Sequence, residues 1–277
     1  ITWGGTGKTP VVAFIADLIS KGNHKTAILI RGYGNDESEL LPKLASKAHV
    51  FVGKDRVKTG RDAIEHGLAD TIILDDGFQY RRLKRDLDII CIDATNPFGN
   101  GWAIPAGSMR EGKRSLKRAD MFLITKSDLV SEKEKVEKLE KRLKTINPRA
   151  LTAKAIHRPL YFYKLSSGEK VNIGELQNKE LVLVSAIGSP ECFEKTIQRL
   201  GLKINKHFVF MDHHLYTKGD TARVEEYCRK NSLGAIVTTE KDAVKLKGQE
   251  WMVLKVRLEI IENEDGFSNR LFGIYNS

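Results

Sequence analysis

The distribution of apolar residues divides the first half of the chain into short buried strands and amphipathic helices. The strand candidates are nearly continuous apolar runs, the pattern of parallel strands that are buried on both faces. They lie at Thr26–Ile30, Ala48–Val52, Thr71–Leu74, Leu87–Ile92 and Met121–Thr125. Apolar residues at helical spacing occur in Val11–Ser20, Asp55–His66 and Glu132–Ile146. Strands that alternate with helices predict an α/β fold, in which a parallel sheet carries helices on both faces.

The pattern changes after Asn147-Pro148. Two extended segments, Leu151–Ile156 and Leu160–Lys164, precede a turn at Ser166–Gly168 and predict a hairpin. A second series of strands and helices follows, with a late strand at Trp251–Ile261. We therefore expect a first α/β domain over residues 1–150, a β-hairpin linker over 151–179, a second, smaller α/β domain over 180–255, and a return strand over 256–277 that packs on the linker.

Composition and charge exclude several classes of protein. The chain is 41% hydrophobic, which is too much for a disordered protein. Its three cysteines, Cys91, Cys192 and Cys228, are dispersed and odd in number, which argues against a disulfide framework and fits a reducing compartment. No apolar run approaches the ~20 residues that span a bilayer. The net charge of +10 favours an anionic partner, although a solvated basic surface would give the same value.

The first ten residues, ITWGGTGKTP, have the composition of a phosphate-binding loop. Glycines let backbone N–H groups approach phosphates, and the following helix presents its positive end to them. Lys8 is expected to reach the β- and γ-phosphates, and the Thr9 hydroxyl to ligate Mg²⁺. Thr2 stands where the strict pattern has glycine, and the strand that normally feeds such a loop is missing, so we expect an N-terminally trimmed chain with a P-loop NTPase-like fold. The phosphate-binding candidates are Gly4, Gly5, Thr6, Gly7, Lys8 and Thr9.

Two adjacent aspartates, Asp75 and Asp76, follow the apolar run Thr71–Leu74. An acidic residue at such a strand end holds Mg²⁺ in phosphate-loop enzymes. The alternative is a turn or helix cap, since Gly77 comes next. Neighbouring carboxylates repel each other unless a cation compensates them, so together with the loop they indicate a magnesium site. Asp93, after another apolar run, is a weaker candidate.

Polar residues also follow the run Met121–Thr125. Thr125-Lys126-Ser127-Asp128 is similar to the element with which GTPases read the guanine base. A loop between a strand and a helix, capped by Ser127 or Asp128, explains the same residues.

Basic residues gather on both sides of the segment Gly99–Gly107, which is rich in glycine and proline. They are suited to a phosphorylated or lipidic substrate, or to acidic headgroups at about 1 kcal/mol per residue. An exposed helix face is the simpler alternative, and the few aromatic residues nearby argue against a nucleic-acid groove. The basic residues are Arg81, Arg82, Lys84, Arg85, Arg110, Lys113, Arg114, Lys117 and Arg118.

Two stretches of the second half carry further candidates. Met211–His214 contains adjacent histidines, whose spacing fits no zinc motif. Thr238–Asp242 closes an apolar strand, where it can cap a helix or direct Lys241 toward a cleft.

Read together, these stretches resemble the tetraacyldisaccharide 4′-kinases, the lipid A 4′-kinases of Gram-negative bacteria. The resemblance rests on an ordered set of motifs rather than on any one of them. They are GGTGKTP at Gly4–Pro10, RGYG at Arg31–Gly34, DE at Asp36-Glu37, VGKDR at Val52–Arg56, DDGFQ at Asp75–Gln79, RDLDI at Arg85–Ile89, GNGWAIPAGSMRE at Gly99–Glu111, IGSP at Ile187–Pro190, DHHLYT at Asp212–Thr217 and TTEKDAVKL at Thr238–Leu246. The chain departs from the family at Ile104 and Ser108-Met109, and its connection between RGYG and DE is shorter.

The resemblance implies ATP- and Mg²⁺-dependent phosphorylation of the 4′-hydroxyl of an acylated diglucosamine 1-phosphate lipid. It implies two α/β domains joined by a β-hairpin linker, and a peripheral enzyme at the cytoplasmic face of the bacterial inner membrane, here without the family's N-terminal anchor. Asp36 and His213 match the family's base pair, with Lys8 as the third catalytic residue. The candidates for substrate binding are Arg31, Tyr33, Gln79, Asn100, Arg110 and Lys241.

Two other functions fit parts of the pattern. A P-loop regulatory GTPase or metallochaperone-like ATPase would explain Thr125–Asp128, and it would prefer GTP and phosphorylate no acceptor. A nucleic-acid binder would explain the charge alone, but the acidic and glycine motifs disfavour it, so we expect no nucleic-acid partner.

Overall fold

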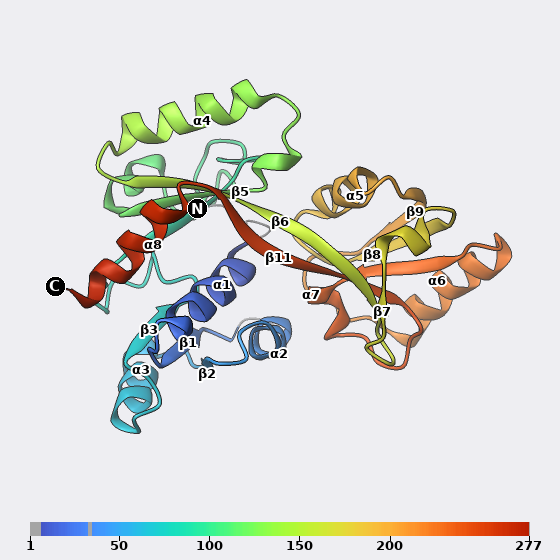
Figure 1. Ribbon diagram of the computed structural model, residues 1–277, viewed down its shortest axis with the longest axis horizontal. Coiled ribbons are helices and arrows are strands. Elements are labelled where there is room, and N and C mark those ends of the chain that lie inside the picture. Colours follow the sequence, from blue (N-terminus) through green and yellow to red (C-terminus); the bar gives the residue numbers. More distant parts are fainter. Residues whose placement is uncertain (1–6, 33–34, 277) are drawn as a thin grey trace. The chain divides into compact units, whose positions relative to one another are not determined.

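The computed structural model describes residues 7–32 and 35–276, with the backbone alone at position 35 (Figure 1). The chain forms two compact units. Unit 1 contains the chain up to residue 33 together with Leu41–His157 and Leu258–Ser277, and unit 2 contains residues 34–40 and Arg158–Arg257. The candidates Gly4, Gly5, Thr6 and Tyr33 lie outside the described residues.

Unit 1 contains two groups of parallel strands. The first is a 3-stranded sheet in the order β2-β1-β3, and the second has the order β4-β5-β6. Its strands and helices are α1 (Lys8–Lys21), β1 (Thr26–Ile30), β2 (His49–Val52), α3 (Arg56–Glu65), β3 (Thr71–Leu74), β4 (Ile89–Asp93), β5 (Met121–Thr125), α4 (Lys133–Ile146) and α8 (Glu264–Phe272), with 3₁₀ turns η1 (Lys113–Arg118), η2 (Ser127–Leu129) and η4 (Gly273–Tyr275).

Strand β1 shows why these residues form a covered parallel sheet. All of its residues are buried. Alternate side chains of a strand point to opposite faces. Ile28 and Ile30 accordingly pack in the cluster that includes α1, while Ala27 and Leu29 pack in the cluster that includes α3. A continuous apolar run is therefore what this strand needs, and the prediction of helices on both faces is confirmed.

Unit 2 contains the parallel strands β11-β10-β8-β9, which belong to the same 8-stranded sheet as β4, β5 and β6. Its central strand β8 (Glu180–Ser185) packs Leu183 with α5 on one face and Val184 with α6 on the other. The short strand β7 pairs antiparallel with β6 and completes the expected hairpin. The other elements are β7 (Lys170–Val171), η3 (Ile173–Leu176), α5 (Pro190–Arg199), β9 (Lys203–Val209), α6 (Lys218–Lys230), β10 (Ala235–Thr239) and α7 (Glu240–Ala243).

Three elements have residues in both units: α2 (Asn35–Leu44), β6 (Leu151–Lys164) and β11 (Met252–Glu262). The two extended segments expected between residues 151 and 164 are one strand, β6. The sequence pattern did not predict α2 or α8. Within residues 7–32 and 35–276, no helix combines the length and the apolar character that crossing a membrane requires.

Candidate active site

Asp76 is the centre of the polar cluster in unit 1. It follows β3 in a left-handed conformation, with φ 52°. Its Oδ1 lies 3.0 Å from Lys8 Nζ and its Oδ2 lies 2.8 Å from Arg110 Nη1. Burial alone would raise the pKa of Asp76, but the Lys8 ammonium and the Arg110 guanidinium outweigh it, so the pKa lies below the usual value. Lys8 from α1 and Arg110 from the loop before η1 thus both contact the carboxylate of Asp76.

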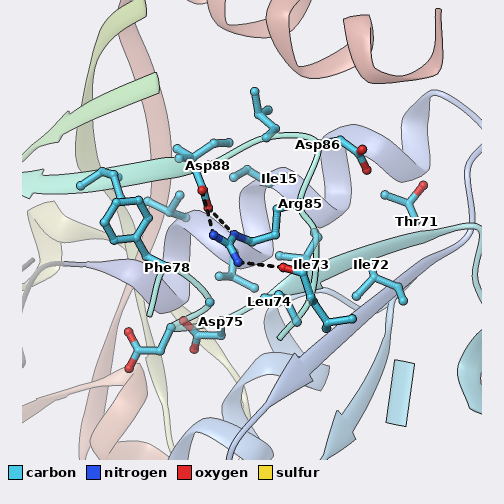
Figure 2. A pocket seen from close by; sticks show the side chains of 18 of the residues that line it. Ile15, Thr71, Ile72, Ile73, Leu74, Asp75, Phe78, Arg85, Asp86 and Asp88 are labelled. Carbon is cyan, nitrogen blue, oxygen red and sulfur yellow. Dashed lines mark hydrogen bonds and ion pairs between the residues drawn. The ribbon is translucent and has the colours of Figure 1, made fainter. Parts of the chain in front are cut away.

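Asp75 differs from its neighbour in both burial and pairing. It is 4% exposed, and its Oδ1 has no hydrogen-bond partner within the described residues. The pKa of Asp75, which lines the pocket shown in Figure 2, is raised, mainly because the carboxyl group is buried and secondly because of the negative charge of Asp76. A buried carboxylate oxygen without a donor beside a second carboxylate is the ligand chemistry that Mg²⁺ prefers, so the residues fit this ion. Thr9 lies in the first turn of α1, next to Lys8 in sequence.

Two further side chains hold the Asp-Asp turn. Arg56, at the start of α3, is 4% exposed, and its Nη1 donates to the Asp76 carbonyl at 3.2 Å. Gln79 donates from Nε2 to the Arg110 carbonyl at 3.0 Å, which links the turn to the Arg110 loop. Burial lowers the pKa of Arg56, and the charge of Arg31, which is exposed after β1, lowers it further. We did not predict a role for Arg56, although it is the last residue of the VGKDR motif. Its role depends on its burial beside the Asp-Asp turn, and that burial could not be inferred before the strand order was known.

Asn100, although exposed, makes hydrogen bonds within its own loop. Its Oδ1 accepts from the backbone N–H groups of Trp102 and Ser108 at 3.3 Å, and its Nδ2 donates to the Ala106 carbonyl at 3.2 Å. Gly107 packs so closely that an added Cβ would lie 2.1 Å from Asn100 Oδ1. The segment that ends in Arg110 is therefore braced from within, and in this structure the polar atoms of Asn100 serve that purpose.

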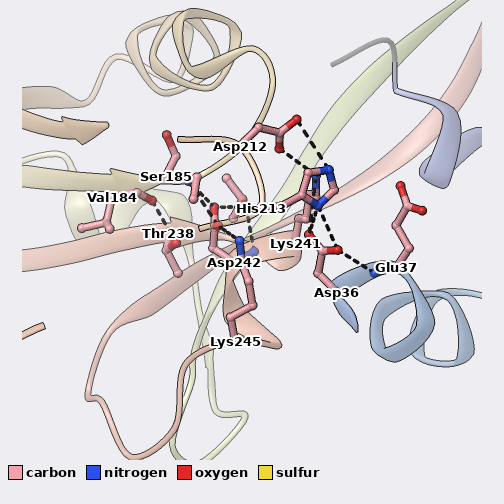
Figure 3. Close-up of polar contacts among 12 residues, drawn as sticks. Asp36, Glu37, Val184, Ser185, Asp212, His213, Thr238, Lys241, Asp242 and Lys245 are labelled. Carbon is pink, nitrogen blue, oxygen red and sulfur yellow. Dashed lines mark hydrogen bonds and ion pairs between the residues drawn. The ribbon is translucent and has the colours of Figure 1, made fainter. Parts of the chain in front are cut away.

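A second polar cluster lies in unit 2 (Figure 3). His213 Nδ1 lies 2.8 Å from Oδ2 and 3.1 Å from Oδ1 of Asp36, whose side chain is only 2% exposed. Lys241 completes the cluster: its Nζ lies 3.0 Å from Asp212 Oδ1, 3.6 Å from Asp36 Oδ2 and 3.5 Å from His213 Nε2. Residues 177 positions apart in the sequence thus form a carboxylate–imidazole pair.

A buried carboxylate fixes the backbone beneath His213. Asp242, in α7, is fully buried and accepts from the Ala186 N–H at 3.2 Å. The Ala186 carbonyl in turn accepts from the His213 N–H at 3.3 Å. His213 itself has φ 65°, a left-handed conformation that costs free energy and persists where the surroundings fix it. The imidazole is therefore held at a defined position.

The segment Thr125–Asp128 connects β5 to a helical turn, which agrees with the second alternative except for its side-chain cap. Lys126 forms a buried ion pair with Asp93, whose other oxygen accepts from the Thr95 N–H at 2.9 Å. The Lys126 ammonium is thereby paired with a carboxylate at the end of the adjacent strand β4. Residues Ser127–Leu129 form the 3₁₀ turn η2, and no side-chain cap precedes it.

Comparisons with known proteins agree with one another. A family model described as tetraacyldisaccharide-1-P 4′-kinase matches residues 1–41 and 35–275. The tetraacyldisaccharide 4′-kinase of Syntrophus aciditrophicus is 34% identical over 284 residues, 92% of this chain and 75% of that protein. The enzyme of the same name from Bdellovibrio bacteriovorus is 35% identical over 274 residues, 89% and 78% of the two chains. A crystal structure of LpxK from Aquifex aeolicus in complex with ATP has a TM-score of 0.72 and 26% identity, and the likeness covers 99% of this chain and 86% of that one.

Proposed function

Because the chain belongs to the tetraacyldisaccharide 4′-kinase family, we propose that it transfers the γ-phosphoryl group of ATP to the 4′-hydroxyl of an acylated diglucosamine 1-phosphate lipid. The product is the 1,4′-bisphosphate, a lipid A precursor. The observation that carries this proposal is the cluster of Lys8, Asp76 and Arg110 around the buried Asp75. Phosphoryl transfer depends on positioned phosphates and on positive charge at the transferring group, and this cluster supplies cations at the end of a parallel strand.

Thr9, Asp75 and Asp76 are the residues that would hold Mg²⁺. When bound, the ion neutralises charge on the phosphate oxygens. Lys8 and Arg110, which pair with Asp76 in this structure, would supply positive charge to the phosphates of ATP. Gly7 and the other glycines of the loop, Gly4 and Gly5, would offer N–H groups to the phosphates, as would Thr6.

The base would be His213. Asp36 accepts a hydrogen bond from the Nδ1–H group of His213. The lone pair on Nε2 is then available to take the proton of the 4′-hydroxyl. As that proton moves to Nε2, the hydroxyl oxygen bonds to the γ-phosphorus and the bond to the ADP oxygen breaks. Lys241 lies 3.5 Å from Nε2, where its positive charge suits an anionic group of the substrate. The motif Thr238–Asp242 had already indicated Lys241 as a residue that can face a cleft.

Lipid binding is proposed for residues around both clusters. The substrate candidates are Arg31, Tyr33, Gln79, Asn100, Arg110 and Lys241. The exposed basic residues near η1 favour an anionic membrane surface at about 1 kcal/mol each, and Trp102, 67% exposed, lies in the neighbouring loop. We propose a peripheral location at the cytoplasmic face of the inner membrane and no nucleic-acid partner. The domain division at residues 150, 179 and 255 remains our proposal.

The test is incubation with γ-labelled ATP and the disaccharide 1-phosphate lipid in detergent micelles. We expect label in the lipid, loss of at least 100-fold in kcat for Lys8→Ala, Asp76→Ala and His213→Ala, and little transfer from GTP. Lys144→Ala, on the solvent side of α4, serves as the matched control. Near-normal turnover in all three variants, or GTP hydrolysis without a phosphorylated lipid, would exclude this assignment.

A further inference from the structure

The short helix α7 carries three consecutive charged residues, and each contacts a different part of unit 2. Glu240 accepts from Lys255 Nζ of β11 at 2.6 Å. Lys241 Nζ lies 3.5 Å from His213 Nε2, and Asp242 contacts the backbone that follows β8 (Figure 3). The position of this one helix therefore decides where several parts of the proposed site lie.

The carboxylate of Asp242 is fully buried and accepts from three groups. The Ala186 N–H lies 3.2 Å from each of its oxygens, and the Thr239 hydroxyl donates to Oδ2 at 2.8 Å. Lys245 Nζ lies 2.8 Å from Oδ1, and the side chain of this lysine is only 4% exposed. A buried carboxylate is costly unless it is hydrogen-bonded and paired, so Lys245 is the residue that compensates the charge of Asp242.

Ala186 connects this buried ion pair to His213. It directly follows β8, and its carbonyl accepts from the His213 N–H at 3.3 Å. His213 has the left-handed φ of 65°, a conformation that costs free energy and that the surroundings must hold in place. If the Ala186 N–H lost its acceptor, this residue would shift, and the backbone of His213 would be free to relax. The imidazole would then leave its position beside Lys241.

We propose that Asp242 and Lys245 are a positioning pair for the phosphoryl transfer. Together they hold Ala186 and, through it, the backbone of His213, so that Nε2 stays next to the Lys241 ammonium. Both residues act through Ala186 and α7, and neither acts on the substrate. This inference rests on the proposed function, because it concerns the base of that reaction.

Two double variants that differ in one acceptor group test the pair. Asp242→Leu with Lys245→Met replaces the ion pair by apolar side chains of similar size, a change that often preserves stability, and it leaves the Ala186 N–H without an acceptor. Asp242→Asn with Lys245→Met also removes both charges but keeps an oxygen for that N–H. Lys154→Met, in unit 1, is the control for the loss of a lysine that pairs with two glutamates, at 3.1 and 2.7 Å.

Four quantities are measured on each protein: kcat for lipid phosphorylation, KM for ATP, Tm and the rate of amide hydrogen exchange at His213. A misplacement of about 1 Å can cost about 10² in rate. We therefore expect the leucine variant to lose at least 10-fold in kcat and to exchange the His213 amide at least 10-fold faster, with the KM for ATP within twofold. The asparagine variant and Lys154→Met should stay within about threefold of the parent in kcat and in exchange.

A leucine variant with the kcat and the His213 exchange of the parent overturns the proposal. A loss of kcat that follows Tm in all the variants also overturns it, because that is the pattern of a purely structural pair. If the leucine variant does not fold, native-state exchange of the parent across denaturant decides. Held by one pair, the Ala186 and His213 amides should open together, with protection that agrees within about threefold at each concentration. Independent opening of the two amides overturns the proposal.

Amide exchange separates this proposal from the proposed function, since it needs no lipid. Coupled exchange of Ala186 and His213 in a parent that phosphorylates no lipid leaves the coupling standing and removes the kinase assignment. Lipid phosphorylation at the rate of the parent in the leucine variant does the reverse.

Discussion

Replacing Asp36 by asparagine tests the catalytic assignment most directly. The Asp36 side chain is 2% exposed and lies 2.8 Å from His213 Nδ1, so asparagine keeps the shape while removing the charge. An amide can donate to Nδ1 and thereby place the imidazole proton on Nε2, which is the wrong tautomer for a base. A comparable change in a serine-protease triad lowers kcat by about 10⁴, which corresponds to about 5.5 kcal/mol in the barrier. We expect a loss of about 10³ to 10⁴ in kcat for Asp36→Asn.

The kinetic pattern distinguishes a base pair from a structural contact. Because Asp36 acts through His213 and not on ATP, the KM for ATP and the Tm of the variant should stay close to those of the parent. Glu39→Gln, an exposed residue of the same helix α2, is the matched control. Lipid phosphorylation is measured in micelles under saturating ATP. A kcat within a few-fold of the parent, or a drop in kcat that is matched by a loss of folded protein, would refute the reasoning.

Three further changes test separate parts of the structure. Gly7→Ala puts a Cβ 2.8 Å from His157 Cε1 at a backbone φ of 76°, so isothermal titration should show ATP affinity at least 10-fold weaker; an unchanged Kd would contradict the close packing of the loop. The pKa of Asp220 is lowered to about 2 by its hydrogen bonds to His214 and Thr217, so it contributes stability above pH 4 that is lost as pH falls toward 2. Asp220→Asn should therefore lower Tm at pH 7 by a few degrees, and the difference from the parent should shrink in scans at pH 3 and below. Burial raises the pKa of Cys91 to about 11, so iodoacetamide at pH 8 should modify it about 100-fold more slowly than a free thiol of ordinary pKa, as peptide mass mapping can measure.

The parallel α/β fold could be predicted because its strands are apolar throughout. Thr26–Ile30, Thr71–Leu74 and Met121–Thr125 are observed at the residues that the pattern gave. The fold class is confirmed by the likeness to the ATP-bound LpxK structure. Helix α2 was missed because its first turn is polar and Pro42 lies inside it, so that the sequence shows no clear helical period of apolar residues. Helix α8 was missed because two buried residues, Phe267 and Leu271, are too few to define a helical period.

Asp75 and Asp76 were predicted as strand-end residues, and the pairing of Asp36 with His213 was expected from the family resemblance alone. Nothing in the local pattern of Asp36 indicates that it meets His213, since that contact depends on how distant segments are brought together. Lys8 and Asp76 were each predicted from a motif, whereas the contacts of Asp76 with Lys8, Arg110 and Arg56 depend on the path of the connecting loops. The assignments of roles to these residues stay predictions, to be decided by the variants above.

The buried pair of Lys126 and Asp93 bears on how short signatures are used to annotate genomes. Removing one partner of such a pair leaves the other as an uncompensated buried charge, so selection retains both residues or replaces both. A lysine kept for this reason yields the same four-letter string, Thr125–Asp128, as a lysine kept to read guanine. Searches that equate the string with GTP specificity will therefore collect chains like this one. A second condition, the absence of an acidic residue at the end of the adjacent strand, would separate the two.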